Sequence, residues 1–190
     1  MKHDQAASRR ILLAAVVVEG GLGVIAILIG RALGYSFADT VPSAWQGLWQ
    51  GAVATLPLLV LLAICIKAPI RPLERLLRLV TELLVPLFRG SRLVDLAIIS
   101  ILAGLGEEML FRGVLQRAIA DRLGAPLGVP IALLAAGVLF GLAHAITLTY
   151  AVLAAVIGLY LGALWIATGN LLAPITAHAI YDFVVLVYLV

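Results

Sequence analysis

Residues 106–113 read Gly-Glu-Glu-Met-Leu-Phe-Arg-Gly and place three formal charges inside an apolar run of the chain. On insertion scales, one such charge at the centre of a membrane helix costs about 2.5–3.5 kcal/mol. Three of them cost roughly 7–10 kcal/mol before pairing, which is comparable to the net stability of about 5–15 kcal/mol of a whole domain. We therefore expect this stretch to have compensating partners, a function, or both.

The spacing of these charges gives them different partners. Glu108 and Arg112 are four residues apart, so they share one face of a helix and can form an ion pair. Glu107 is rotated by about 100° from Glu108 and cannot share the same arginine as easily. We predict a structural pair of Glu108 with Arg112 and a reactive Glu107. A buried cluster that only orients helices is the alternative.

The composition is that of a membrane protein. Apolar residues make up 64% of the 190 residues and charged residues only 12%, whereas a soluble domain is about half apolar and a quarter charged. The formal net charge of +3 comes from basic residues beside apolar segments, so we expect no nucleic-acid partner. The single cysteine, Cys65, excludes a disulfide framework and is expected to be a small buried hydrophobe.

Long apolar segments predict an all-α fold, a polytopic membrane helix bundle of about six transmembrane helices. The expected spans are residues 11–29, 51–66, 93–123, 129–145, 148–167 and 171–189. Residues 1–10 are expected to be a polar tail, and residues 31–50 a loop with interfacial tryptophans.

One further helix is expected at the membrane surface, within residues 67–92. Arg71, Arg75 and Arg78 alternate there with leucines at helical spacing. This pattern is typical of an amphipathic helix that lies along an anionic membrane surface.

The distribution of basic residues favours one orientation. The N-terminal tail and residues 67–92 together hold nine Lys and Arg residues, whereas the intervening loop and the turn near residue 120 hold three. By the positive-inside rule we expect both termini in the cytoplasm. We expect one structural domain, with a two-span region at 1–92 and a core at 93–190, in a multi-pass protein of a bacterial cell membrane.

Polar residues recur in the fourth and sixth expected spans. Phe140 and His144 are four residues apart near the end of the fourth expected span. His178 and Asp182 have the same spacing in the sixth, so each pair shares a helix face. A single histidine in such a segment is more often a packing residue, but two histidines with nearby acids favour a functional site.

A comparison of heights tests whether these residues can meet. If the third and fourth spans form an antiparallel hairpin, Glu107 and His144 lie equally far from its turn and stand at the same level. His178 fits less well, because it lies close to the turn that precedes its own span. Tilt, or an irregular segment at 146–150, is needed to bring His178 to the others.

The motifs together resemble those of the CPBP family of intramembrane proteases. That family groups type II CAAX prenyl proteases with bacterial Abi and bacteriocin-processing proteins. The matching patterns, over about residues 93–190, are Glu-Glu-x-x-x-Arg (Glu107, Glu108, Arg112), Phe-x-x-x-His (Phe140, His144) and His-x-x-x-Asp (His178, Asp182). The resemblance implies a polytopic helical endopeptidase whose motif residues surround a cavity within the membrane.

The resemblance also implies roles for these residues. Glu107 would act as general base and hold a water molecule together with His144. His178 would stabilise the oxyanion, assisted by residue 182, while Glu108, Arg112 and Phe140 would support the site. CAAX proteases typically have Asn at the position of Asp182. Because an ionised carboxylate repels an oxyanion, Asp182 is expected to be protonated, to orient His178 or to bind a metal.

The resemblance leaves the cofactor open, because the family has been described both as metalloproteases and as metal-independent glutamate proteases. Glu107, His144 and His178 would suit Zn²⁺. The His-Glu-x-x-His arrangement of soluble zinc proteases is absent from the sequence, which favours a metal-free mechanism.

We therefore predict an intramembrane endopeptidase that cleaves a membrane-embedded or lipidated peptide, with the lipid bilayer as its other partner. A proton-linked transporter is an alternative, because intramembrane acids and histidines are expected there too. Repeated halves, which many transporters have, are not found in the sequence. A non-catalytic immunity or adaptor protein on the same scaffold is the second alternative.

Overall fold

The computed structural model describes the backbone of residues 2–190 and the side chains of residues 12–83 and 85–190. The described residues form helices and their connections, which confirms the predicted all-α class. The elements are, in chain order, α1 (Lys2–Ala32), the short 3₁₀-helix η1 (Ala38–Thr40), α2 (Ala44–Lys67), α3 (Arg71–Phe88), α4 (Leu93–Glu108), the π-helix η2 (Met109–Gln116), α5 (Arg117–Leu123), α6 (Gly128–Ala143), α7 (Leu148–Thr168) and α8 (Leu172–Leu189).

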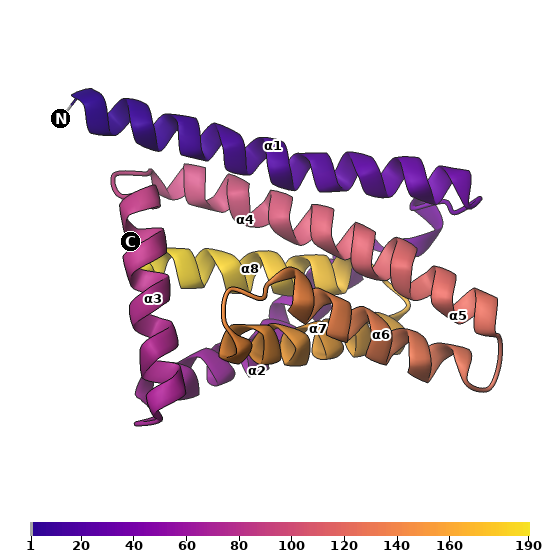
Figure 1. Ribbon diagram of the computed structural model, residues 1–190. Helices are drawn as coiled ribbons and strands as arrows, with labels where there is room; N and C mark the ends of the chain where they lie inside the picture. Colours follow the sequence, from indigo (N-terminus) through magenta and orange to yellow (C-terminus); the bar gives the residue numbers. More distant parts are fainter. Residues whose placement is uncertain (1) are drawn as a thin grey trace.

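Helices that are distant in sequence pack along one another. α8 packs against both α2 and α4, α1 packs along α4, and α6 packs along α7, as Figure 1 shows. Gly51 permits the close approach of α2 to α8, because a Cβ atom there would lie 2.5 Å from the carbonyl oxygen of Ala173. Such contacts through small residues are typical of helices that associate in membranes.

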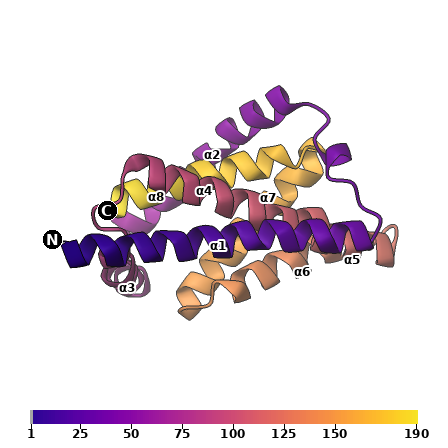
Figure 2. The same ribbon diagram turned by 90° about the horizontal axis from the view of Figure 1, so that it is seen from above.

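α3 differs from the other long helices in its direction. It crosses one end of the bundle transversely to α1, α4 and α8 (Figure 1), and the view turned by 90° agrees (Figure 2). Both termini of the chain lie near this end. The bounds of α3, Arg71–Phe88, fall within the segment in which an amphipathic helix was expected.

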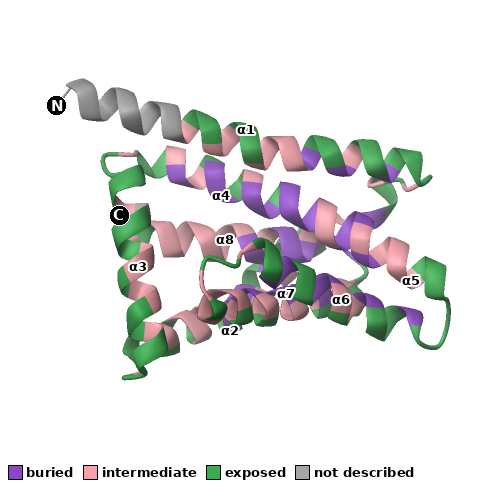
Figure 3. Ribbon diagram, in the orientation of Figure 1, coloured by how far each residue is buried: buried purple, intermediate pink, exposed green. Residues whose placement is uncertain are grey.

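The burial pattern is the reverse of that of a soluble protein. Large apolar side chains are exposed on the outside of the bundle, for example Val17 at 70% and Leu148 at 82%, whereas Glu108 and Arg112 are fully buried. Figure 3 shows buried residues on α4 and exposed residues along α1 and α6. An apolar exterior around buried charges is what a lipid environment requires.

Within the described part of the chain, four helices are long and apolar enough to cross a membrane. They are Leu12–Ala32, Ala44–Lys67, Leu148–Thr168 and Leu172–Leu189. α6 is apolar but has only 16 residues, fewer than the about 20 that a span needs. The continuous segment formed by α4, η2 and α5 contains the motif charges. The expected number of about six spans therefore stays a prediction, as does the division of the chain at residue 92.

Two sequence-based boundaries are wrong. α1 begins at Lys2, so the expected polar tail is part of the first helix. α2 begins at Ala44, so Trp45 and Trp49 lie in its first turns and not in a loop. The start of α2 follows from its N-cap, because the Ser43 side chain accepts a hydrogen bond from the backbone N–H of Gln46.

Candidate active site

The charged stretch lies where the α-helical backbone gives way to a π-helix. α4 ends at Glu108, and η2 continues the same helical segment from Met109 to Gln116. π-Helical turns are rare and often occur at functional sites. The π-helix was not predicted, because the spacing of apolar residues does not distinguish its wider turn from an α-helical turn.

Glu108 and Arg112 form the predicted ion pair. The Nη1 atom of Arg112 donates to Oε1 of Glu108 at 2.8 Å. Its Nη2 atom donates to the carbonyl oxygen of Gly158 at 2.6 Å. A fully buried charge is stable only when it is paired and hydrogen-bonded, and these contacts provide both. The pair thereby connects the charged stretch to α7.

His178 extends this network to α8. Its Nδ1 atom lies 2.9 Å from Oε1 of Glu108. Because that carboxylate oxygen also accepts from Arg112, it is an acceptor for the ring as well, and Nδ1 carries the proton. The Nε2 atom faces Oδ2 of Asp182 at 3.4 Å, which is longer than a usual hydrogen bond. The ring is thus fixed on one side and more loosely held on the other.

His144 and Glu107 form a second pair beside the first. The Nδ1 atom of His144 donates to the carbonyl oxygen of Phe140 at 2.8 Å, because a carbonyl only accepts. The other ring nitrogen, Nε2, lies 3.5 Å from Oε2 of Glu107. Within the described part of the chain, that carboxylate oxygen is buried and has no hydrogen-bond partner. Oε2 of Glu108 is in the same state, so Glu107 is distinguished by the imidazole that its oxygen faces.

Phe140 lies between the two pairs. Its ring stacks on His144 with a centroid distance of 4.5 Å and meets His178 edge-on at 5.9 Å. The guanidinium of Arg112 lies 4.7 Å from the same ring. Phe140 therefore holds both imidazoles and the buried cation in fixed relative positions.

The structure brings together the residues that the sequence singled out. Glu107 and His144 stand at the same level, as the hairpin argument predicted. His178 also reaches the site. α6 ends at Ala143, and the non-helical segment is residues 144–147. It overlaps the irregular segment expected at 146–150 only in part, because α7 begins at Leu148. No pattern in the sequence predicts the Gly158 carbonyl as a partner of Arg112.

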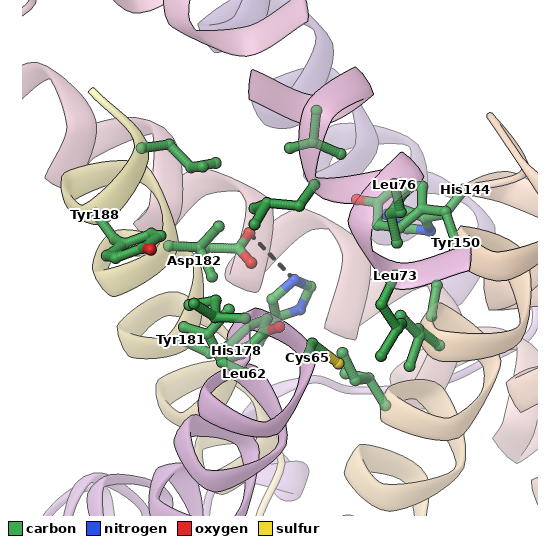
Figure 4. A pocket seen from close by; sticks show the side chains of 18 of the residues that line it. Leu62, Cys65, Leu73, Leu76, His144, Tyr150, His178, Tyr181, Asp182 and Tyr188 are labelled. Atoms are coloured by element: carbon green, nitrogen blue, oxygen red, sulfur yellow. Dashed lines mark ion pairs between the residues drawn. The ribbon is translucent and has the colours of Figure 1, made fainter. Parts of the chain in front are cut away.

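A cavity of about 200 Å³ opens beside the histidines (Figure 4). His144, His178 and Asp182 line its polar part. Its other walls are mostly apolar and come from α2, α3, α6, α7 and α8. They include Leu62 and Cys65 of α2, Leu73 and Leu76 of α3, Tyr150 of α7 and Tyr188 of α8. Tyr150, whose ring lies 6.0 Å from that of His144, was not singled out from the sequence.

The side chains do not assemble the predicted metal-ligand set. Among the residues whose side chains are described, no three His, Cys, Asp or Glu residues gather closely enough to hold an ion. Glu107 and His144 are adjacent, but the two ring nitrogens of His178 face Glu108 and Asp182. The arrangement therefore does not fit a zinc ion held by Glu107, His144 and His178.

A model of the type II CAAX prenyl endopeptidase Rce1-like family matches residues 89–184, just over half of the chain. The chain belongs to this family. No curated protein and no solved structure matches it. The matched range of this Rce1-like chain contains every motif residue described above, and it confirms the resemblance to the CPBP family.

Membership in the Rce1-like family also bears on activity and location. It supports a protease, and together with the four long apolar helices it supports a membrane protein. The predicted roles of individual residues of this Rce1-like chain stay predictions.

Proposed function

We propose that this protein is an intramembrane endopeptidase that hydrolyses a peptide bond in a membrane-embedded or lipidated peptide. The observation that carries the proposal is the contact between Oε2 of Glu107 and Nε2 of His144, next to a mostly apolar cavity. The carboxylate oxygen lacks a hydrogen-bond partner among the described residues, and the nitrogen has a lone pair when Nδ1 carries the proton. A water molecule between them would meet two acceptors.

The chemistry follows from these two acceptors. Glu107 takes a proton from the water, and the hydroxide oxygen attacks the carbonyl carbon of the scissile bond. When the resulting tetrahedral intermediate collapses, the carbon–nitrogen bond breaks and the proton passes to the leaving amine. His144 orients the water and shares this proton.

His178 supplies stabilisation for the developing negative charge. Because its Nδ1 proton is donated to Glu108, the ring offers an Nε2 proton to an oxyanion only in its doubly protonated form. Oδ2 of Asp182, 3.4 Å from Nε2, is an acceptor that keeps this nitrogen facing it. We therefore assign Asp182 the orienting role among the three that the sequence left open.

Glu108 and Arg112 act through His178 and not on the substrate. Glu108 accepts the hydrogen bond from the Nδ1–H group of His178. Arg112 balances the charge of the Glu108 carboxylate in a fully buried position. They are positioning residues, because truncating either one leaves the other as an uncompensated buried charge.

We further assign the enzyme to the metal-independent glutamate type. The support is the use of both His178 nitrogens by carboxylates. Chelation with EDTA or 1,10-phenanthroline is expected to leave the cleavage rate unchanged. A loss that added Zn²⁺ restores would overturn this part of the proposal while leaving the protease assignment standing.

The remaining assignments follow from charge and composition. The transverse helix α3 and both termini would lie on the cytoplasmic side, because basic residues concentrate there. The compact chain suggests a bacterial cell membrane as its location.

Cleavage by the purified protein in lipid vesicles tests the proposal. The substrates are a prenylated peptide with a C-terminal CAAX sequence, its unlipidated counterpart and an apolar transmembrane peptide, with products mapped by mass spectrometry. Glu107→Gln is expected to lower cleavage by about 10²–10⁴-fold. The matched control is Asp121→Asn, which neutralises an acid with a 59% exposed side chain. Equal cleavage by Glu107→Gln and wild type would refute the mechanism, and proton flux without cleavage would favour a transporter.

A further inference from the structure

The cavity beside the catalytic residues is covered by α3, the helix that crosses the end of the bundle. Leu73, Leu76 and Leu77 of α3 line the same cavity as His144 and His178. Figure 4 shows Leu73 and Leu76 on the side of the cavity where His144 lies. The apolar face of this amphipathic helix is thus used as a wall of the candidate active site.

The opposite face of α3 is basic and exposed. Arg71, Arg75 and Arg78 are all exposed. At about 100° per residue they fall within an arc of about 60°, while Leu76, Leu77 and Val80 lie on the far side of the helix. One helix therefore presents cations outward and a cavity wall inward.

The two ends of α3 are held differently. At the C-terminal end, Phe88 is buried in a cluster with Leu96 and Ile99 of α4. Gly90 follows in the left-handed region, with φ of 82°. At the N-terminal end, residues 68–70 are a non-helical connection to α2. The half of α3 that covers the cavity is therefore joined to the bundle by this short connection, whereas the other end is anchored by Phe88.

We propose that α3 is a lid that anionic lipid headgroups hold over the catalytic cavity, so that lipid charge controls access to the site. The inference rests on the proposed function only for the catalytic role of the cavity, because access to the cavity is measurable without cleavage. The partner is an anionic membrane surface. Its recognition follows from the basic face of α3 and from the transverse direction of this helix relative to the spans.

The size of the effect follows from the charges on the exposed face. A basic residue near an anionic surface changes an equilibrium about fivefold. Glu74 and Glu82 lie on the same face and oppose the arginines, whereas the exposed Lys67 and Arg92 at the two ends of the lid add to them. We expect anionic lipid to slow access to the cavity at least about fivefold at low salt, and less at high salt because of screening.

Cys65 is a natural reporter of this access. It is the only cysteine in the chain, and it lines the cavity together with the leucines of α3. The full-length protein is placed in bilayers of phosphatidylcholine alone or with phosphatidylglycerol. The rate of Cys65 modification by N-ethylmaleimide is then followed by mass spectrometry. Slower modification in the anionic bilayer is the expected result.

A matched control separates the lid from other effects of lipid charge. The double variant Cys65→Ser/Ile64→Cys moves the thiol by one residue to an outward position, since Ile64 is 54% exposed. The rate at which the thiol of this variant is modified is expected to be the same in both bilayers. An equal slowing of both thiols would mean that lipid charge acts on the reagent, and the proposal would fail.

Two charge variants then test whether the exposed charges of α3 produce the dependence on lipid charge. The triple variant Arg71→Gln/Arg75→Gln/Arg78→Gln keeps good helix formers and is expected to lose the lipid dependence of Cys65 modification. Glu74→Gln/Glu82→Gln on the same face is expected to strengthen that dependence. Wild-type labelling that ignores lipid charge, or a triple variant that responds like wild type, would overturn the proposal.

The same assay separates this inference from the proposed function. Glu107→Gln is expected to abolish cleavage but to keep the lipid-dependent modification of Cys65. If no peptide is cleaved and the labelling still follows lipid charge, the lid stands and the protease proposal fails. If cleavage requires Glu107 and labelling ignores lipid charge, the protease stands and the lid fails.

Discussion

Oε2 of Glu107 lies 3.5 Å from Nε2 of His144, across the contact between the charged stretch and the end of α6. The neighbouring carboxylate, Glu108, is in a different state, because its Oε1 atom accepts from both Arg112 and His178. The two adjacent acids thus have different surroundings. Glu108 forms structural contacts with Arg112 and His178, whereas Glu107 faces the imidazole of His144. This difference is the physical basis for assigning them different roles.

His144→Ala is expected to lower cleavage by about 10²–10⁴-fold with little loss of stability. The side chain is 25% exposed, and among the described residues its ring donates a hydrogen bond to the Phe140 carbonyl of the preceding turn. Its removal takes the imidazole away from Glu107, but the Oε2 atom of that carboxylate has no hydrogen bond to lose among the described residues. Cleavage kinetics and thermal unfolding in detergent measure the two effects. Tyr150→Phe is the control, since it keeps the neighbouring ring; cleavage by His144→Ala at the wild-type rate would exclude a catalytic role.

The site was largely readable from the sequence because its clues are local. Glu108 and Arg112 pair at a spacing of four residues, and intramembrane charges are costly enough to demand an explanation. The equal distances of Glu107 and His144 from one turn placed them at one level. Each inference used helix geometry alone and needed no knowledge of how distant helices pack.

Other features depend on tertiary packing and had no sequence signal. The carbonyl of Gly158 meets Arg112 only because α7 packs beside the charged stretch. The role of α3 as a cavity wall also follows from packing, since the pattern of arginines and leucines predicts an amphipathic helix but not what its apolar face covers. Trp45 and Trp49 lie in α2 and not in the predicted loop, because Ser43 caps the helix just before them.

Arg112→Leu is expected to lower the free energy of unfolding by about 3–5 kcal/mol, because it leaves the buried Glu108 without its cation. Arg112→Lys is expected to restore this only in part. A single ammonium group cannot reproduce the planar fork that bonds Glu108 and the Gly158 carbonyl at once. Thermal unfolding in detergent measures both variants. The control Asp121→Asn removes only a weak ion pair with Arg117 at 3.9 Å, from a carboxylate that is 59% exposed, so little change is expected.

Wild-type stability of Arg112→Leu would contradict this assignment. It would mean that Glu108 is held as a neutral acid and that the pair contributes no net charge compensation.

Asp182→Asn is expected to keep cleavage within about tenfold of wild type, a change of about 1.4 kcal/mol in the barrier. The amide oxygen can still accept from Nε2 of His178, which lies 3.4 Å from the carboxylate in the wild type. Asp182→Ala removes the acceptor and is expected to lose more activity. The ratio of the two cleavage rates is the measurement. If Asn and Ala are equally inactive, the charge of Asp182 is required and an orienting role alone is insufficient.

Gly106→Ala is expected to destabilise the protein by about 1–3 kcal/mol, the usual cost of overpacking. A Cβ atom at this position would collide with the backbone carbonyl oxygen of Glu19 and lie 3.1 Å from the amide of Gly23, so α1 would be pushed away from α4. Because Glu107 is the next residue, cleavage is expected to fall as well.

Thermal unfolding and cleavage kinetics are compared with those of Gly20→Ala, whose Cβ would have nothing within 4 Å. Gly20→Ala is expected to be neutral or stabilising by up to about 1 kcal/mol. Equal stability of the two variants would show that α1 does not pack on the charged stretch as closely as the contact requires.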